Sequence, residues 1–213
     1  MTVSRRAFGL ATGAFAIAAL AGLPVAAQAG LSAEDRATLA QAQTYLQNLT
    51  SAQGEFVETG PGGQRRTGHF WLQRPGRMRF EYTDPAGLLV VSDGSNVKRY
   101  DPRLNVFRQV PLSATPLSTF LARNVRLDQG VSIDRVTRMA SGAFAITARD
   151  AAKPNEGSVI LAFAGNPARL QEWTITDAQG GRTRTQLTSL SAAPNLAASL
   201  FRLRDPTRRP RRN

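Results

Sequence analysis

Few residues in this chain have side chains that could carry out covalent chemistry. The sequence contains one histidine, His69, and no cysteine. A Ser-His-acid triad or a multi-histidine metal site would depend on His69, which lies beside Phe70 in a strand-like run. The glycines of residues 60–63 fall in a hairpin-like turn, whereas phosphate-binding loops join a strand to a helix. The composition favours a binding protein over an enzyme and indicates neither a metal nor a cofactor.

The candidate functional residue is Arg74, a charged side chain at a turn between two aromatic-rich runs. The stretch 69–82, HFWLQRPGRMRFEY, reads as two strands joined by an Arg-Pro-Gly turn. In the second strand Met78, Phe80 and Tyr82 share one face by the two-residue period, and the charged residues between them share the other. An arginine offers five donors in a rigid fork, which suits the unpaired carbonyls at the end of a helix. From the residues alone, a solvent-facing turn residue is an equally good interpretation of Arg74.

A helix is the first element expected after the N-terminal region. Ser32 followed by Asp35 resembles a capping box, and leucines and alanines then recur at helical spacing. These signals predict an amphipathic helix from Ala33 to Leu49.

From residue 52 onward the pattern changes to short β-rich runs separated by Gly, Pro, Asn and Asp turns. Counting the runs between these turns predicts eleven strands. Their expected ranges are 52–59, 65–73, 77–83, 88–92, 96–100, 104–109, 131–139, 143–149, 158–164, 169–176 and 183–191.

Eleven strands with one apolar face cannot form a flat, exposed sheet. Such a sheet must close on itself, pack against helices, or enclose an apolar ligand. A short helix is expected between 111 and 130, where Leu117, Phe120 and Leu121 share a helical face, and another at Pro194 to Leu200. The economical solution is an unclosed antiparallel half-barrel covered by a lid of about three helices.

The two ends of the chain differ from this domain in composition. Residues 1–29 contain Arg5 and Arg6, then a Gly- and Ala-rich apolar run, then Ala27-Gln28-Ala29, which predicts a cleaved, Tat-like signal peptide and export. Residues 30–201 are expected to form a single domain. Gly and Pro interrupt the apolar run, which is therefore too weak for a membrane anchor.

The C-terminal tail, residues 202–213, holds six of the arginines behind the formal net charge of +12. We interpret it as a disordered, solvated end, with docking to acidic headgroups or a protein as the alternative. Nucleic acid is not an expected partner, because an exported chain rarely meets it.

A specific run in the first half of the chain resembles the outer-membrane lipoprotein carrier (LolA) family. Order and spacing agree over residues 68–124. The matching residues are Gly68, Trp71, Arg74-Pro75, Phe80, Thr83, Pro85, Val91-Ser92-Asp93-Gly94, Tyr100-Asp101-Pro102 and Phe120-Leu121-Ala122-Arg123-Asn124.

The resemblance implies a monomeric periplasmic chaperone that binds the acyl chains of lipoproteins in an apolar cavity. It would receive them from an inner-membrane ABC transporter and deliver them to an acceptor protein at the outer membrane or to that membrane itself. The resemblance also implies that Arg74 holds the lid shut through the backbone of Phe120, Leu121 and Ala122. The apolar face of Met78, Phe80 and Tyr82 would then line the cavity.

Two other interpretations stay open at this stage. A lipid or glycolipid carrier would use the same half-barrel, because both kinds of ligand present alkyl chains. An envelope sensor that detects lipoproteins without transporting them would also share the fold.

Overall fold

The computed structural model describes residues 30–115 and 117–208. The predicted signal peptide, residues 1–29, and the last part of the predicted tail, residues 209–213, lie outside the described residues. One compact unit begins at Leu31, and all of the elements below belong to it.

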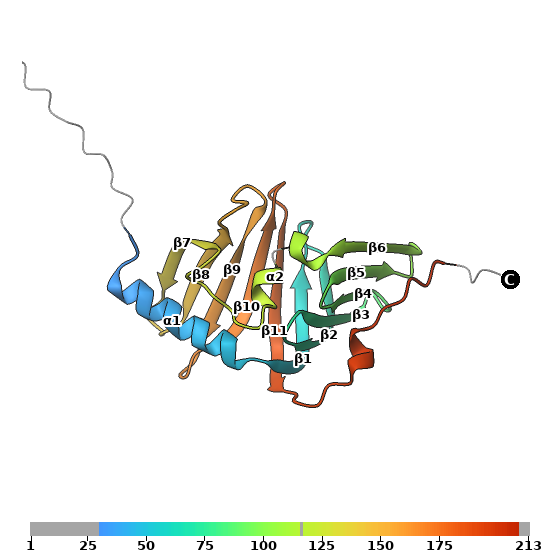
Figure 1. Ribbon diagram of the computed structural model, residues 1–213, viewed down its shortest axis with the longest axis horizontal. Coiled ribbons are helices and arrows are strands. Elements are labelled where there is room, and N and C mark those ends of the chain that lie inside the picture. The colour runs from blue at the N-terminus through green and yellow to red at the C-terminus, as the bar shows by residue number, and fades with distance from the viewer. Residues whose placement is uncertain (1–29, 116, 209–213) are drawn as a thin grey trace, which may run out of the picture. The chain divides into compact units, whose positions relative to one another are not determined.

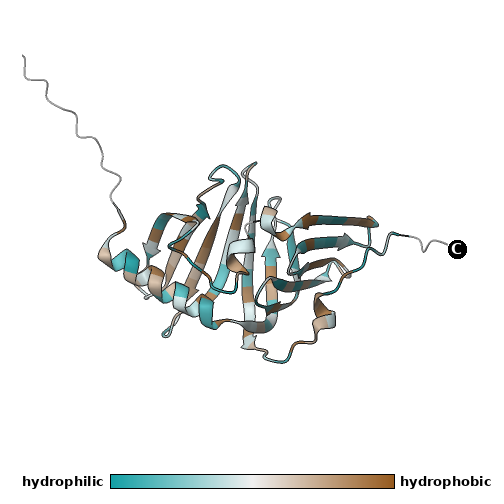
Figure 2. Cartoon of the chain, viewed as in Figure 1, coloured by the Kyte–Doolittle hydropathy of each residue, from teal (hydrophilic) through white to brown (hydrophobic). Residues whose placement is uncertain are grey.

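The first element is helix α1 (Ala33–Asn48), and its start confirms the predicted cap. The Ser32 hydroxyl accepts a hydrogen bond from the backbone N–H of Asp35 at 3.0 Å, and the Asp35 carboxylate accepts one from the N–H of Ser32 at 3.3 Å. Figure 2 shows hydrophilic and apolar residues alternating along the helix, and Leu39, Ala42 and Leu46 are buried. The periodic residues therefore place one face of α1 against the sheet.

All eleven predicted strands are present and form a single antiparallel sheet. They are β1 (Ser51–Thr59), β2 (Arg65–Gln73), β3 (Arg77–Asp84), β4 (Leu89–Asp93), β5 (Asn96–Asp101), β6 (Val106–Pro111), β7 (Val131–Arg138), β8 (Phe144–Asp150), β9 (Gly157–Ala164), β10 (Arg169–Asp177) and β11 (Arg182–Ala192). Strand β6 begins two residues later than predicted, because Asn105 adopts a positive φ of 50° and extends the preceding turn.

The strand order leaves the barrel open and explains which segment of the chain covers the concave face of the sheet. Strand β1 pairs with both β2 and β11, so the order runs β6-β5-β4-β3-β2-β1-β11-β10-β9-β8-β7. The edges β6 and β7 are consecutive in the chain yet lie at opposite ends of the sheet. Their connection must therefore cross the full width of the sheet, and it carries the 3-10 turn η1 (Leu112–Ala114) and the short helix α2 (Leu117–Phe120) (Figure 1). We call α1 together with segment 112–130 the lid.

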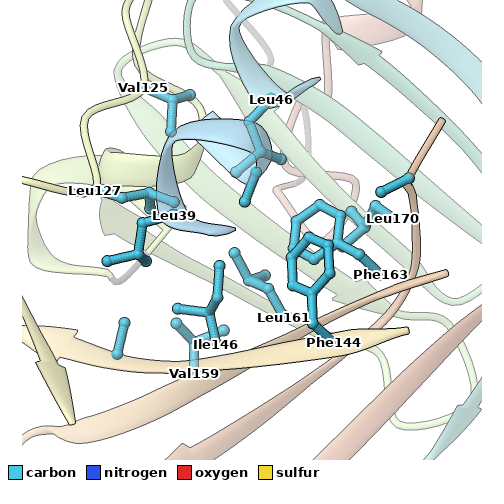
Figure 3. Packing of buried hydrophobic residues seen from close by; sticks show 13 residues of the cluster. Leu39, Leu46, Val125, Leu127, Phe144, Ile146, Val159, Leu161, Phe163 and Leu170 are labelled. Carbon is cyan, nitrogen blue, oxygen red and sulfur yellow. The ribbon is translucent and has the colours of Figure 1, made fainter. Parts of the chain in front are cut away.

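The lid packs against the sheet through two groups of buried side chains. Beneath α1, Leu39 and Leu46 pack against apolar residues of β8, of β9 and of the first part of β10 (Figure 3). Val125 and Leu127, which belong to the lid, are part of the same group. The second group lies over β1 to β4 and includes Phe56, Phe70, Met78, Phe80 and Leu121. Trp173 and Leu187 contact both groups, so the centre of the sheet joins them.

The predicted third lid helix at Pro194 to Leu200 is wrong, and the described residues form two α-helices rather than three. The segment forms one 3-10 turn, η2 (Ala198–Phe201), which contacts β3 and β4. Arg79 donates to the carbonyl of Leu200 at 3.2 Å, and Arg79 points to the opposite face from Met78 and Phe80. Because the buried ring of Phe201 anchors this segment to the convex face, the segment neither extends its helix nor joins the lid.

Within the described ranges, no helix is long and apolar enough to span a bilayer. The described part of the predicted tail, residues 202–208, continues from η2, and Leu203 and Arg204 lie beside Lys98 and Phe107 of strands β5 and β6.

Candidate functional site

An apolar cavity lies between the lid and the concave face of the sheet. Its volume is about 90 Å³, small against the roughly 300–1,000 Å³ of pockets that hold drug-sized ligands. The lid contributes Leu46, Leu117, Phe120 and Leu121, and the C-cap residue of α1 contributes Leu49. Most of the remaining lining consists of apolar side chains of the sheet, namely Ala52, Phe70, Leu72, Met78, Phe80, Val159, Leu161, Leu170, Trp173, Ile175, Leu187 and Leu190. We call this space the main cavity.

Arg74 is the one charged residue in the lining of the main cavity, and its guanidinium contacts both lid helices. Nε and Nη2 donate to the carbonyl of Phe120, at 3.1 and 2.8 Å. Nη1 donates to the carbonyls of Leu46 and Leu49. Leu46 lies in the last turn of α1, Leu49 is its C-cap, and Phe120 ends α2. One side chain therefore joins the C-terminal ends of two helices that are far apart in sequence.

The backbone of the turn that carries Arg74 is hydrogen-bonded to the lid and to the residue that precedes β1. The N–H of Arg74 donates to the carbonyl of Thr50 at 2.8 Å, and the N–H of Gly76 donates to that of Leu121 at 2.7 Å. Gly76 has a φ of 74°, and a Cβ there would lie 2.7 Å from the Cα of Gly94. Only glycine fits this position, so the sequence Arg-Pro-Gly places the guanidinium at the rim of the sheet.

The charge of Arg74 is partly removed from water and is stabilised by carbonyl dipoles. Burial lowers the pKa of Arg74 to about 10, so the guanidinium remains protonated at neutral pH. A positive charge is favourable at the C-terminal end of a helix, where the last carbonyls have no partner within the helix. Burial also raises the pKa of Tyr45, one turn before the end of α1, which keeps that phenol neutral.

The structure brings most of the residues expected at this site together. Leu121 accepts its bond from Gly76 rather than from Arg74, and the N–H of Ala122 bonds to Thr119 at 3.4 Å. Met78 and Phe80 line the main cavity. Tyr82 is buried next to Phe56 and lies outside that lining.

The different position of Tyr82 has a simple cause. Its hydroxyl donates to Glu58 at 2.8 Å, and Glu58 also forms an ion pair with Arg66 at 2.9 Å. Burial is the largest cause of the raised pKa of Tyr82, followed by the nearby charge of Glu58. A phenol needs a hydrogen-bond partner when it is buried, and the polar end of β1 supplies one.

Sequence reasoning missed the contacts that fasten the lid segment to α1. Gln47 donates through Nε2 to the carbonyl of Val125 at 3.0 Å. Gln43 accepts from the N–H of Leu127 at 2.8 Å. The two glutamines are four residues apart and so share one face of a predicted helix, a signal that the sequence did contain. Their partners are backbone atoms of a loop that is distant in sequence, and the sequence alone did not indicate that this loop contacts α1.

His69, the other residue singled out from the sequence, lies away from the main cavity. Its ring is partly exposed and Nδ1 lies 3.8 Å from a carboxylate oxygen of Glu55. Among the described residues, no group of three or more His, Asp or Glu side chains is arranged to hold a metal ion.

Comparison with known proteins places this arrangement in a family. The family model of the outer membrane lipoprotein carrier protein LolA matches residues 47–204. The outer-membrane lipoprotein carrier protein of Methylobacillus flagellatus is 32% identical, over 80% of this chain and 81% of that protein. That of Leptothrix cholodnii is also 32% identical, over 95% and 94%.

Among solved structures, a LolA superfamily protein from Nitrosomonas europaea aligns with a TM-score of 0.44 at 11% identity, covering 79% of this chain and 97% of that one. The family match spans both the turn that carries Arg74 and the lid segment that it contacts. This chain belongs to the outer membrane lipoprotein carrier protein LolA family.

Proposed function

We propose that this protein is a periplasmic carrier that binds the acyl chains of lipoproteins between its lid and its sheet. It would take lipoproteins from an inner-membrane ABC transporter and deliver them to the outer membrane or to an acceptor there. The observation that carries the proposal is the apolar cavity beneath two helices whose C-terminal ends are joined by one arginine. Membership of a carrier family supports transport rather than catalysis as the activity.

The lining of the main cavity suits alkyl chains and little else. Apart from Arg74 it is built from aliphatic and aromatic side chains, among which only the indole N–H of Trp173 can donate a hydrogen bond to a polar ligand. Moving each CH₂ group of an acyl chain out of water contributes about 0.8 kcal/mol. A ligand with several long chains therefore has enough binding free energy to displace a few lid contacts.

The size of the main cavity implies that the lid must move. A volume of about 90 Å³ is too small for a long acyl chain, so the described conformation is the closed one. Hydrogen bonds to a charged donor contribute roughly 1.5–3 kcal/mol each, and the burial of several long acyl chains, at about 0.8 kcal/mol per CH₂ group, offsets the loss of all four made by Arg74. We assign Arg74 the role of a latch that acyl chains, or a partner, can open.

The direct test is binding and transfer with a defined ligand. The mature protein should bind a triacylated lipopeptide and pass it to outer-membrane vesicles or to an acceptor. Strong binding of free phospholipid with no binding of the lipopeptide would overturn the proposal in favour of a lipid carrier. Mass spectrometry of the apolar ligand that copurifies with the protein identifies the ligand independently.

A cellular experiment separates a carrier from a sensor. Depletion of the protein should leave lipoproteins at the inner membrane if the protein carries them. A changed stress response with normal lipoprotein location would contradict the proposed role.

A further inference from the structure

A second, smaller cavity adjoins the main cavity at the other side of α2. Its volume is about 40 Å³, and it lies between the lid and the ends of β8 and β9. Phe120 and Val159 line both cavities. Phe120 therefore lies where the two spaces meet, and its backbone carbonyl accepts hydrogen bonds from Arg74.

The lining of this second cavity differs in chemistry from that of the main cavity. Val131 and Ala148 join Phe120 and Val159 as an apolar inner wall. The other lining residues include hydroxyl and charged groups, among them Ser113, Thr119, Asp150, Lys153 and Glu156. Since Ser113 and Lys153 are exposed, the cavity opens to solvent. The second cavity is therefore an amphipathic space, accessible to solvent, next to the apolar main cavity.

The charged side chains around the second cavity are of both signs, and the charges balance. Arg149 donates to Asp134 through Nε at 2.8 Å, and Lys153 pairs with Glu156 at 3.1 Å. These pairs leave no concentrated positive charge that would select a phosphate. The chemistry fits neutral polar groups, such as the ester and amide carbonyls that join acyl chains to a lipopeptide head.

Those carbonyl groups would have no good position in the main cavity. Two side chains of its lining carry donors: Arg74, whose three donor nitrogens are directed at the carbonyls of Phe120, Leu46 and Leu49, and Trp173, whose single indole N–H is too few for the several carbonyls of a lipopeptide head. A buried carbonyl without a hydrogen-bond partner carries a large desolvation penalty. The second cavity, in contrast, combines hydroxyl groups and access to solvent with an apolar wall.

We propose that the second cavity holds the polar head of the acylated ligand, and that the acyl chains run from there past Phe120 into the main cavity. This inference rests on the proposed function and specifies the orientation of the ligand. Releasing the carbonyl of Phe120 from Arg74 would then open the passage between the cavities, which couples the latch to ligand entry.

The orientation is tested with two photoreactive forms of one diacylated lipopeptide, bound to the mature protein and mapped by mass spectrometry. A diazirine beside the glycerol should label residues 113–119 or 148–158. A diazirine at the end of the acyl chain should label the wall of the main cavity that lies furthest from the second cavity, on β2 and β3 at residues 70–80. Labelling of residues 46–52 or 72–78 by the head probe would place the head at the Arg74 rim and overturn the inference.

The same experiment distinguishes this inference from the proposed function. A protein that fails to bind either lipopeptide contradicts the carrier role, and fatty acids with the same two photoreactive groups then still report where a polar end lies. Head labelling at the Arg74 rim with normal lipopeptide binding contradicts only the orientation.

Two substitutions provide an independent test in solution. Thr119→Val removes a hydroxyl at nearly constant shape and should weaken lipopeptide binding by about three- to tenfold. It should leave binding of a plain alkane-chain probe unchanged. Thr188→Val, on the exposed part of β11, is the control and should change neither. Equal losses for both ligands in Thr119→Val would indicate a structural effect and contradict a head-group contact.

Phe120→Ala separates the passage from the latch, because it removes the ring and keeps the backbone carbonyl that Arg74 contacts. It should accelerate lipopeptide uptake severalfold. An unchanged or slower uptake rate would show that the ring of Phe120 does not obstruct the path.

Discussion

Arg74 and Phe120, 46 positions apart in the chain, are joined by two hydrogen bonds from one guanidinium to one carbonyl oxygen. The same guanidinium also contacts the end of α1 through the carbonyls of Leu46 and Leu49. Because both lid helices end at this side chain, a change at one residue acts on the whole cover of the cavity.

Arg74→Leu should open the lid without unfolding the sheet, because the backbone bonds of the turn do not involve the side chain. Arg74 makes four such hydrogen bonds, so their loss should cost at least the roughly 1.5–3 kcal/mol of a single bond in lid closure. Hydrogen exchange at the end of α1 and in α2 should therefore become at least about 10- to 100-fold faster. Ligand release or uptake should change in parallel.

The control for this prediction is Arg77→Leu. Arg77 is exposed on the same turn, and its described hydrogen bond is to Gln73 at 3.2 Å. Equal exchange rates in both variants, or unchanged transfer kinetics in Arg74→Leu, would remove Arg74 from the mechanism.

The two lid glutamines should respond in opposite ways to the same substitution. Gln43 accepts a hydrogen bond, so Gln43→Glu keeps the acceptor that faces the N–H of Leu127. Gln47 donates, so Gln47→Glu sets a carboxylate against the carbonyl of Val125. We expect Gln47→Glu to destabilise the protein by about 1–3 kcal/mol and Gln43→Glu to be nearly neutral. Denaturant unfolding measures both, and the reverse order would contradict the assigned contacts.

A negative charge in the main cavity should block acyl binding. Leu72 lines this cavity near its rim and is only partly buried, so Leu72→Glu should still fold. Lipopeptide affinity should fall roughly 100-fold or more, because an alkyl chain cannot satisfy a carboxylate. Gln73→Glu, the next residue on the strand, faces the other side and should bind normally. Equal affinity in the two variants would show that ligand does not enter this space.

The ion pairs at the start of α1 make a prediction about pH. The hydrogen bond from Arg138, followed by that from Ser32, lowers the pKa of Asp35 below its ordinary 3.8. The folded state therefore gains stability above about pH 4, and this gain is lost as the pH falls through the lowered value. Carboxyl NMR should find an Asp35 midpoint below 3.8 that rises in Arg138→Gln. An unchanged midpoint in that variant would contradict the pairing.

The sequence by itself determined the elements of this protein. Strands could be placed because turn residues separate runs with a two-residue period, and α1 because its cap and its apolar spacing are local signals. The motif residues near Arg74 and Phe120 also sufficed to indicate the family. The helix expected at Pro194 to Leu200 failed because the burial of Phe201 on the convex face, a tertiary contact, limits that segment to one turn.

Only the tertiary structure decided which groups meet. The pairing of β1 with β11 leaves β6 and β7 at opposite edges, and this forces their connection across the concave face. That crossing brings the carbonyl of Phe120 to Arg74, and it divides the space beneath the lid into two cavities of different polarity. Tyr82 is a second example. The two-residue period predicts which face of β3 its side chain is on, but its hydrogen-bond partner Glu58 lies on β1 and could not be predicted from the sequence. Periodicity fixes which way a side chain points, whereas its contacts depend on residues that the fold brings from elsewhere in the chain.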